Sequence, residues 1–312
     1  MKNVASFFSG SGGIDIAFLQ NGFKIVYANE IDEYPAKIYD LNHTIKTDIR
    51  DIHFVEPEEI PECDIIIGGF PCTSFSIAGY RKGFEDERSG DLFFELARII
   101  KAKKPSIIFL ENVKNLVGHD NGKTFTIIKE CLEDIGYHLK YKVLNAMEYG
   151  NIPQNRERIY IVGFLDKEQY YKFQFPDKIE LTTKLTDIID FNKKCDDKYY
   201  YKEGRIAEEL KREINDKNAV YQWRRQYVRK NKNGVVPTLT ANMGTGGHNV
   251  PIVKTRYGIR KLTPRECFNV QGYPKDYKLP LDMANGRLYK AAGNSVVVPV
   301  ISRIAKNIKS VI

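Results

Sequence analysis

CDIIIGGFPC, residues 63–72, is the stretch that decides the fold. Its three consecutive isoleucines, Ile65 to Ile67, lead into a Gly-Gly pair. A short, continuous apolar run predicts a strand that is buried on both faces, which is typical of parallel sheets. The following loop places Cys72 near the carboxyl end of this strand, where open α/β sheets bind ligands. A thiolate there is a candidate nucleophile, although a lone cysteine is more often a small buried hydrophobe.

Apolar runs and amphipathic segments alternate around this stretch, over about the first 165 residues. The alternation predicts an α/β fold with a parallel sheet covered on both faces. Because residues 158–164 lie close behind residues 141–146, we expect them to add an antiparallel strand at the sheet edge. The other predicted strands cover 4–8, 24–28 and 106–110, and the predicted helices lie near 14–21, 32–41, 90–103 and 123–135.

The composition changes from about residue 176, where Lys, Asp, Asn and Tyr dominate. Residues 234–251 are rich in Gly and Pro and are predicted to be largely loop. Residues 287–312 predict a turn followed by an apolar helix, which needs a core to pack on. We therefore expect a larger α/β domain, a smaller irregular domain, and a C-terminal helix docked on the larger one.

Positive charge is concentrated in one part of this chain, whose net charge is +8. Eleven Lys and Arg but no Asp or Glu lie between Lys217 and Arg265. Aromatic residues alternate with the basic ones from Tyr221 to Lys230, a composition that suits nucleic-acid phosphate. Because charge patterning is a weak signal, a solvated basic face without a partner remains an alternative.

The cysteines do not indicate a disulfide framework or a zinc site. The five are scattered, at positions 63, 72, 131, 195 and 267, with no C-x-x-C pair. No run of about 18 apolar residues predicts a membrane span, and the N-terminal residues lack a signal-peptide apolar region. We expect a cytoplasmic protein without a structural metal.

A glycine-rich loop, FFSGSGGID (7–15), follows the first predicted strand. Its glycines allow a tight turn and a close backbone approach to a ligand. Glu30, twenty residues beyond Gly10, is placed to accept hydrogen bonds from a ribose. Asp15 stands where a dinucleotide-binding loop has its third glycine, and an acid there is expected to repel a pyrophosphate. S-adenosylmethionine (AdoMet) fits better, and an ordinary glycine-rich turn is the alternative.

Further candidate groups follow the later strands. Glu111 and Asn112 lie near the end of SIIFLENV (106–113) and are expected at the same sheet edge as Cys72. Burial and nearby negative charge would keep the Glu111 carboxyl protonated and able to donate to a ring nitrogen. Arg156 and Arg158 are two residues apart, so on a strand their side chains would point to the same side. There they would bind phosphate, a substrate carbonyl or Glu111. Ordinary ion pairs are the alternative.

Taken together, these motifs resemble the DNA (cytosine-5) methyltransferases of bacterial restriction–modification systems. The similarity covers nearly the whole chain, with the family's motifs in the family's order: FFSGSGG, GGFPCTSFS, ENV, QNRER, RKLTPRE and GNSVVVPV. The resemblance implies a Rossmann-like AdoMet-dependent methyltransferase sheet with a smaller, irregular target-recognition domain. It assigns 1–175 and 286–312 to the catalytic domain, 176–257 to target recognition and 258–285 to a hinge segment.

The resemblance also implies the catalytic roles. Cys72 matches the nucleophile that attacks C6 of a flipped-out cytosine, after which C5 accepts the methyl group. Glu111 matches the donor to N3, and Arg158 matches the residue that binds the base carbonyl. Asn112 resembles the residue that fixes the loop. Gln154 and Arg156 complete that motif, with Arg156 expected on phosphate or the catalytic loop.

Cofactor contacts follow from the same resemblance. Glu30 matches the ribose ligand, Ile31 the residue packed on adenine, and Asp48 the acceptor of the adenine amino group. The remaining expected contacts are Phe8, Gly10, Gly12, Gly13, Pro71, Leu92, Asn294 and Ser295.

Double-stranded DNA is the implied substrate. Residues 73–90 resemble the loop that closes over the flipped base, and the glycines after Thr238 and Leu239 would let that region enter the major groove. Thr73, Ser89 and Ala291 depart from the commonest pattern without removing a catalytic group. The expected DNA contacts are Ser76, Arg88, Arg224, Arg225, Arg229, Lys230, Thr238 and Leu239. A monomer is expected, and a cognate restriction endonuclease would act on the same site without needing to bind the protein.

Three other functions remain open. A tRNA cytosine-5 methyltransferase would share the motifs, but the basic segment after residue 176 favours duplex DNA. An inactive DNA-binding module is disfavoured by the intact Cys72, Glu111 and Arg158. A nicotinamide dehydrogenase rests on the glycine loop alone, and Asp15 argues against it.

Overall fold

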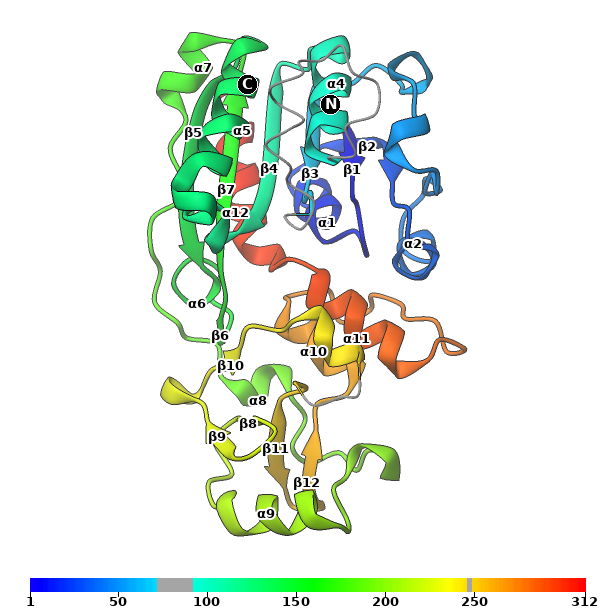
Figure 1. The fold of residues 1–312 in the computed structure, drawn as a ribbon, viewed down its shortest axis with the longest axis vertical. Coiled ribbons are helices and arrows are strands. Elements are labelled where there is room, and N and C mark those ends of the chain that lie inside the picture. Colours follow the sequence, from blue (N-terminus) through cyan, green and yellow to red (C-terminus); the bar gives the residue numbers. More distant parts are fainter. Residues whose placement is uncertain (72–91, 246–248) are drawn as a thin grey trace. The chain divides into compact units, whose positions relative to one another are not determined.

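The computed structural model describes residues 1–71, 92–245 and 249–312. The chain forms two compact units (Figure 1). Unit 1 consists of Met1–Leu144, Glu157–Asp177 and Val300–Ile312, and unit 2 of Asn145–Arg156 and Lys178–Pro299. This division differs from the domain boundaries expected from the sequence, because residues 145–156 and 286–299 lie in unit 2. The return of the C-terminal helix to the large α/β unit agrees with expectation.

A six-stranded sheet forms the centre of unit 1, in the order β2-β1-β3-β4-β7-β5. The first four strands are parallel, and β7 is antiparallel to β4. The predicted antiparallel strand is therefore confirmed, but its predicted edge position is wrong, because β5 forms that edge. The strands are β1 Asn3–Phe7, β2 Lys24–Asn29, β3 Ile65–Gly68, β4 Ile107–Val113, β5 His138–Asn145 and β7 Glu157–Phe164.

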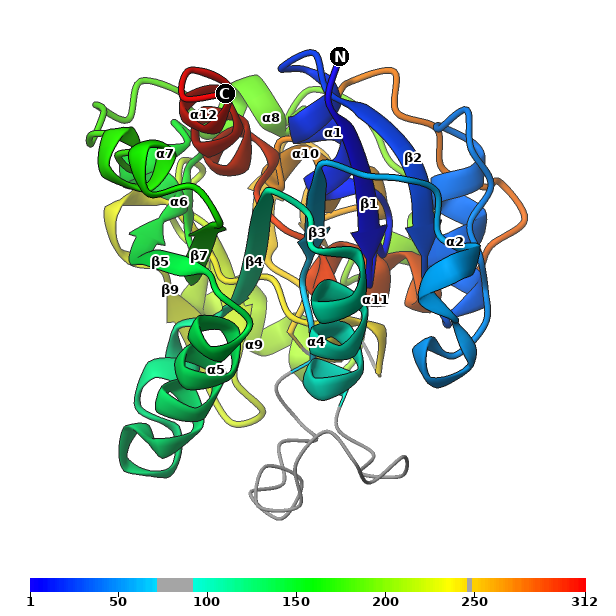
Figure 2. The same cartoon turned by 90° about the horizontal axis from the view of Figure 1, so that it is seen from above.

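Helices cover both faces of this sheet, as the apolar strands require (Figure 2). Helices α4 (Leu92–Lys103) and α5 (Lys123–Asp134) pack on one face, where their buried positions join the main hydrophobic cluster. Helices α1 (Gly13–Leu19) and α12 (Val298–Lys309) lie on the other face. The side chain of Asn21 donates to Ser302 at 3.0 Å and ties the end of α1 to α12. Unit 1 also contains α2 (Glu33–Asp40) and α7 (Lys167–Lys172).

Unit 2 contains a small antiparallel sheet in the order β12-β11-β8-β9. Its core includes Leu210, Tyr221, Trp223 and Ile252. A second, two-stranded sheet pairs β6 (Gln154–Asn155) with β10 (Val236–Pro237) in parallel. The other elements are α6 Ala146–Tyr149, α8 Leu185–Ile188, α9 Arg205–Glu213, β8 Tyr221–Trp223, β9 Val228–Lys230, β11 Ile252–Thr255, β12 Gly258–Lys261, α10 Pro264–Val270 and α11 Asn285–Asn294.

A buried ion pair joins β12 to α10. The Arg260 guanidinium is 0% exposed and donates to both carboxylate oxygens of Glu266 at 2.7 Å. Glu266 also accepts from the backbone of Thr263 and completes a capping box at the start of α10. Because an uncompensated charge in this place would be costly, the two side chains depend on each other. In the described part of the chain, no helix has the length and apolar character needed to cross a bilayer.

Candidate functional site

The glycine loop after β1 turns back on its own backbone. Gly10 and Gly12 have φ of 54° and 75°, in the left-handed region that favours glycine. The Gly12 N–H donates to the Ser9 carbonyl at 2.8 Å, and the Gly10 N–H donates to the Glu30 carboxylate at 2.9 Å. These two donors therefore already have partners within the protein and are not left for a pyrophosphate. A Cβ on Gly12 would lie 2.2 Å from His43 Nε2, so this position also lacks space for a side chain.

Asp15 lies below the loop and does not face a ligand. It is 0% exposed, and its carboxylate accepts from Ser6 Oγ and Tyr39 Oη, each at 2.9 Å. Burial raises the pKa of Asp15 to about 6. The expectation that this acid would repel a pyrophosphate is thus wrong, because sequence position did not reveal its inward direction. The engaged N–H groups of the loop argue against a dinucleotide instead.

Glu30 and Asp48 lie on two neighbouring segments that run parallel at the end of β2, and each acid is followed by an isoleucine. Residues 29 and 48 form a parallel bridge, and the Glu30 N–H donates to the Asp48 carbonyl at 3.0 Å. Glu30 is half-buried, and its carboxylate is oriented by the N–H groups of Gly10 and Asp32. The next residue on each segment is an exposed isoleucine: Ile31 is 59% exposed and Ile49 is 60% exposed.

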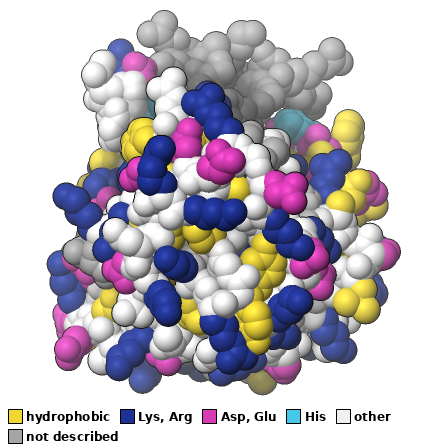
Figure 3. Space-filling model, turned by 90° about the horizontal axis from the view of Figure 1, so that it is seen from below, with side chains coloured by type: hydrophobic (Ala, Val, Ile, Leu, Met, Phe, Trp, Pro, Cys, Tyr) yellow, Lys and Arg dark blue, Asp and Glu magenta, His cyan; other side chains and the backbone are white. Residues whose placement is uncertain are grey.

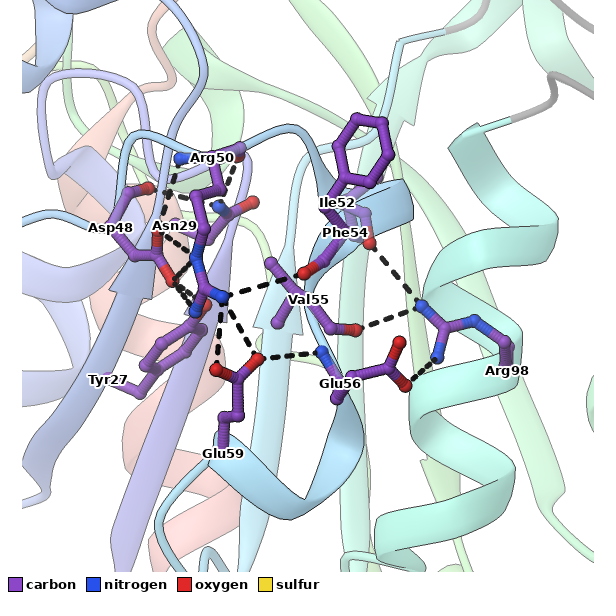
Figure 4. A network of polar contacts seen from close by, with 10 residues as sticks. All are labelled: Tyr27, Asn29, Asp48, Arg50, Ile52, Phe54, Val55, Glu56, Glu59 and Arg98. Atoms are coloured by element: carbon purple, nitrogen blue, oxygen red, sulfur yellow. Dashed lines mark hydrogen bonds and ion pairs between the residues drawn. The ribbon is translucent and has the colours of Figure 1, made fainter.

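Arg50 holds the Asp48 carboxylate in place (Figure 4). Its guanidinium lies 2.8 Å from Asp48 and 3.0 Å from Glu59, between the two carboxylates. Tyr27 Oη also donates to Asp48, at 2.8 Å. The hydrogen bonds from Arg50 lower the pKa of Asp48, which stays ionised. The sequence did not predict a role for Tyr27, Ile49 or Arg50. The one signal that it offered was the apolar Ile49 directly after the acidic Asp48.

This part of unit 1 offers acceptor and apolar groups that would suit a nucleoside. Acceptor groups for hydroxyls come from Glu30 and apolar contact area comes from Ile31 and Ile49, while the loop N–H groups that would bind phosphate are engaged. Phe8, at φ 52°, is half-buried beside the loop. Among the described residues, no group of three His, Cys, Asp or Glu side chains is placed to hold a metal ion.

A second group of polar side chains lies at the carboxyl end of β4. Arg158 Nε on β7 is 3.1 Å from Glu111 Oε1, and the side chains are 14% and 10% exposed. The charged group beside Glu111 is thus a cation, whereas the sequence analysis expected nearby negative charge. Asn112 Nδ2 donates to the Phe70 carbonyl at 2.9 Å. This bond anchors the chain two residues before Cys72, which itself lies outside the described residues.

Arg156 and Arg158 do not share a strand face. Strand β7 begins at Glu157, so Arg156 precedes it and belongs to unit 2. The Arg156 guanidinium is 3% exposed and donates to the carbonyls of Leu239, Gly293 and Ser295. This burial argues against the expected phosphate contact, and the bonds connect Arg156 to two other segments of unit 2.

Gln154 has a similar position in unit 2. It is 0% exposed and donates to the Val270 carbonyl and to Gln271 Oε1, each at 3.0 Å. Its Oε1 accepts from the Leu239 N–H at 3.3 Å. Gln154 therefore connects three segments of unit 2 through its amide, which is a structural function.

A basic groove of about 950 Å³ lies within unit 2. It is lined by five Lys and Arg side chains together with neutral polar ones, among them Asn155, Thr238 and Asn242. Leu239 is 1% exposed and lies in the core instead. Figure 3 shows Lys and Arg spread over the face seen from below with Asp and Glu among them, so charge alone does not locate the groove. The five basic side chains are Arg224, Arg225, Arg229, Lys230 and Lys232.

The other predicted contacts are placed as follows. Pro71 is exposed, and Leu92 begins α4 and is half-buried. Asn294 and Ser295 lie in unit 2, where Ser295 Oγ is 2.6 Å from Tyr273 Oη. Their contact with a cofactor stays a prediction. Ser76 and Arg88 lie outside the described residues.

Comparisons with known proteins identify the family. The family model described as "C-5 cytosine-specific DNA methylase" matches residues 2–310. The chain is 60% identical to the type II methyltransferase M.Bsp6I of Bacillus sp. (strain RFL6), over 99% of this chain and 98% of that one. It is 40% identical to M.HhaI of Haemophilus parahaemolyticus, over 97% and 93%. The Schizosaccharomyces pombe Dnmt2 structure shares the fold, with a TM-score of 0.75 at 19% identity over 99% of each chain. The chain therefore belongs to the C-5 cytosine-specific DNA methylases and is a DNA (cytosine-5) methyltransferase.

Proposed function

We propose that the protein transfers a methyl group from AdoMet to C5 of a cytosine within a short, specific sequence of double-stranded DNA. The observation that carries the proposal is the cluster at the end of β4. The Glu111–Arg158 pair and the bond from Asn112 to Phe70 bring two polar groups next to the chain that leads to Cys72. An acid and a cation at the end of β4, together with the nucleophile expected two residues after Phe70, are the groups that covalent chemistry on a pyrimidine requires.

The Cys72 thiolate attacks C6 of the base and forms an S–C6 bond. In its protonated form, the Glu111 carboxyl donates a proton to N3, so the electrons displaced from the C5–C6 double bond make C5 nucleophilic. Arg158 binds the base carbonyl and withdraws electron density from the ring. AdoMet would supply the methyl group that C5 takes, with S-adenosylhomocysteine as the leaving group. The C5 proton is then lost to solvent, and the N3 proton returns to Glu111 as the thiolate leaves C6, which restores the aromatic ring.

AdoMet would be held by the glycine loop and by the segment that includes Asp48. Glu30 accepts the ribose hydroxyls, because its carboxylate is already oriented by two backbone N–H groups. Ile31 and Ile49 offer exposed apolar surface for the adenine ring. Asp48 is fixed by Arg50 and Tyr27 and marks the polar edge of this apolar surface.

The base must leave the duplex to be reached, since C5 and C6 are stacked inside it, and flipping costs a few kcal/mol. The basic groove of unit 2 supplies cations for the phosphates on either side. The named relatives are type II methyltransferases, which supports a role in protecting host DNA from a cognate endonuclease. We propose a monomer that acts in the bacterial cytoplasm, where its DNA substrate is found.

The test is to incubate unmethylated genomic DNA with the purified protein and AdoMet and then to sequence it after bisulfite conversion. Protected cytosines within one short motif are the expected result. Cys72→Ala should protect none while it binds AdoMet with nearly unchanged affinity in calorimetry. Protection by the Cys72→Ala variant would refute the covalent route. If wild-type protein binds AdoMet but protects no cytosine in DNA, the DNA substrate is wrong, and transfer RNA is the next substrate to test.

A further inference from the structure

The β8–β9 hairpin in unit 2 presents two arginines at its tip. Strands β8 and β9 pair with Trp223 opposite Val228, and Arg224 to Tyr227 connect them. The hairpin rests on a core, since Tyr221 and Trp223 are 2% and 7% exposed. The Arg224 and Arg225 side chains, in contrast, are exposed and line the basic groove. The tip is thus a short β-ribbon whose buried base holds exposed guanidinium groups.

The tip has a defined conformation. The Arg224 N–H donates to the Tyr227 carbonyl at 2.8 Å, and the Gln226 N–H donates to the Arg224 carbonyl at 2.8 Å. Arg225 has φ of 64°, a left-handed conformation that is uncommon for a residue with a side chain. Such a conformation persists only where the surrounding structure imposes it, and it is concentrated at functional sites. The turn therefore fixes the direction in which the Arg225 Cα–Cβ bond leaves the backbone.

The basic residues on this hairpin fall into two groups. Lys230 is paired with Asp216 at 2.7 Å, and Arg229 donates to Gln222, which lies opposite it in the strand register. The side chains of Arg224 and Arg225 have neither a hydrogen-bond nor an ion-pair partner among residues 1–71, 92–245 and 249–312. The strand cations are thus already engaged within the protein, whereas the tip arginines are available to a ligand.

We propose that Arg224 and Arg225 are specificity-determining residues that read guanine in the major groove of the DNA. The inference rests on the proposed function, because it assumes a duplex DNA substrate. A two-stranded β-ribbon fits the major groove, and a planar guanidinium binds O6 and N7 of guanine with two hydrogen bonds. Lys232 lines the same groove, but a lysine ammonium is a point charge without this paired geometry. Lys232 is assigned to phosphate, which carries no sequence information.

Charge-preserving substitutions separate base reading from phosphate binding. Arg224→Lys and Arg225→Lys keep the positive charge but remove the two-pronged donor geometry. The methylated motif of each variant is determined by incubating unmethylated genomic DNA with AdoMet and sequencing it after bisulfite conversion. We expect at least one G·C pair of the motif to lose about 10- to 100-fold in discrimination. The dependence of non-specific DNA binding on salt should stay unchanged, because the number of cations is the same.

Two further variants keep the test decisive. Lys230→Gln is the matched control, and its methylated motif should equal that of the wild type even where its rate falls. Arg225→Gly suits the left-handed φ and removes the side chain, so it should fold well and still relax the motif. An unchanged motif in Arg224→Lys, Arg225→Lys and Arg225→Gly would overturn the inference. If the wild-type protein methylates no cytosine in DNA, the proposed function itself is overturned. This outcome differs from an unchanged motif in the variants, which overturns only the inference about Arg224 and Arg225.

Discussion

Gly12→Ala should destabilise the protein more than the same change at Gly10, although both glycines have a left-handed backbone. An alanine in that conformation costs about 1–2 kcal/mol at either position. Among the described residues, the added Cβ at Gly10 would have only the Phe8 carbonyl within 4 Å, at 3.9 Å. At Gly12 it would lie 2.2 Å from His43 Nε2 and 3.0 Å from Tyr39 Cδ2.

The two rings below Gly12 cannot move aside at low cost. They are stacked with centroids 3.9 Å apart and planes at 16°, and Tyr39 is also held by its bond to Asp15. Overpacking of a well-packed site costs about 1–3 kcal/mol more. We therefore expect a loss of about 1–2 kcal/mol for Gly10→Ala and about 2–5 kcal/mol for Gly12→Ala.

Urea denaturation of the two single variants, of His43→Ala and of Gly12→Ala/His43→Ala measures these losses. Removal of the imidazole should relieve the clash, so the double variant should be about 1–3 kcal/mol more stable than the sum of the single effects predicts. Equal losses at Gly10 and Gly12 would refute the steric explanation. Additive effects of Gly12→Ala and His43→Ala would refute it as well.

Three further changes test other parts of the structure. Glu111→Gln should reduce methyl transfer by about 10²- to 10⁴-fold in a radiolabelled methyl assay while the thermal unfolding midpoint stays close to that of the wild type; a wild-type rate would remove Glu111 from the mechanism. Arg260→Met should lower the free energy of unfolding in denaturant by about 3–5 kcal/mol, because it leaves the buried Glu266 carboxylate without its partner. Arg260→Met/Glu266→Met should recover part of this loss. Equal losses in the single and the double variant would contradict this explanation. The pKa of Asp15 is raised in the folded protein, from 3.8 to about 6. The free energy of unfolding of the wild type should therefore fall by on the order of 3 kcal/mol relative to that of Asp15→Asn as the pH rises from about 4 to 6. Parallel curves of unfolding free energy against pH would show that Asp15 does not titrate in this range.

The local elements of unit 1 were predictable because each has a strong signal of its own. The isoleucines of β3 form an uninterrupted apolar run, and α4 has apolar positions at helical spacing, of which Phe93, Leu96 and Ile100 are buried. The position of β7 in the sheet was not predictable in this way. It pairs with β4, about 50 residues earlier, as well as with β5. Strand order depends on such long-range pairing, which periodicity does not record.

In the candidate site, too, local signals were predictable and long-range contacts were not. Glu111 and Asn112 were located from the strand that they end, and the structure places Arg158 beside Glu111. The alternation of Arg156 with Arg158 suggested one shared face, but β7 begins between them. Arg156 instead meets three carbonyls that are far away in the sequence.

By itself, the sequence determined the family, the kinds of secondary structure in unit 1 and the residue types needed for methyl transfer, because motifs and periodicity are local properties of the chain. Only the tertiary structure decided which charged groups have partners. Asp15 is directed into the protein, and Lys230 is paired with Asp216, while Arg224 and Arg225 remain exposed at a hairpin tip. The free energy of a charged side chain depends on its burial and its neighbours, and both are set when distant segments pack together.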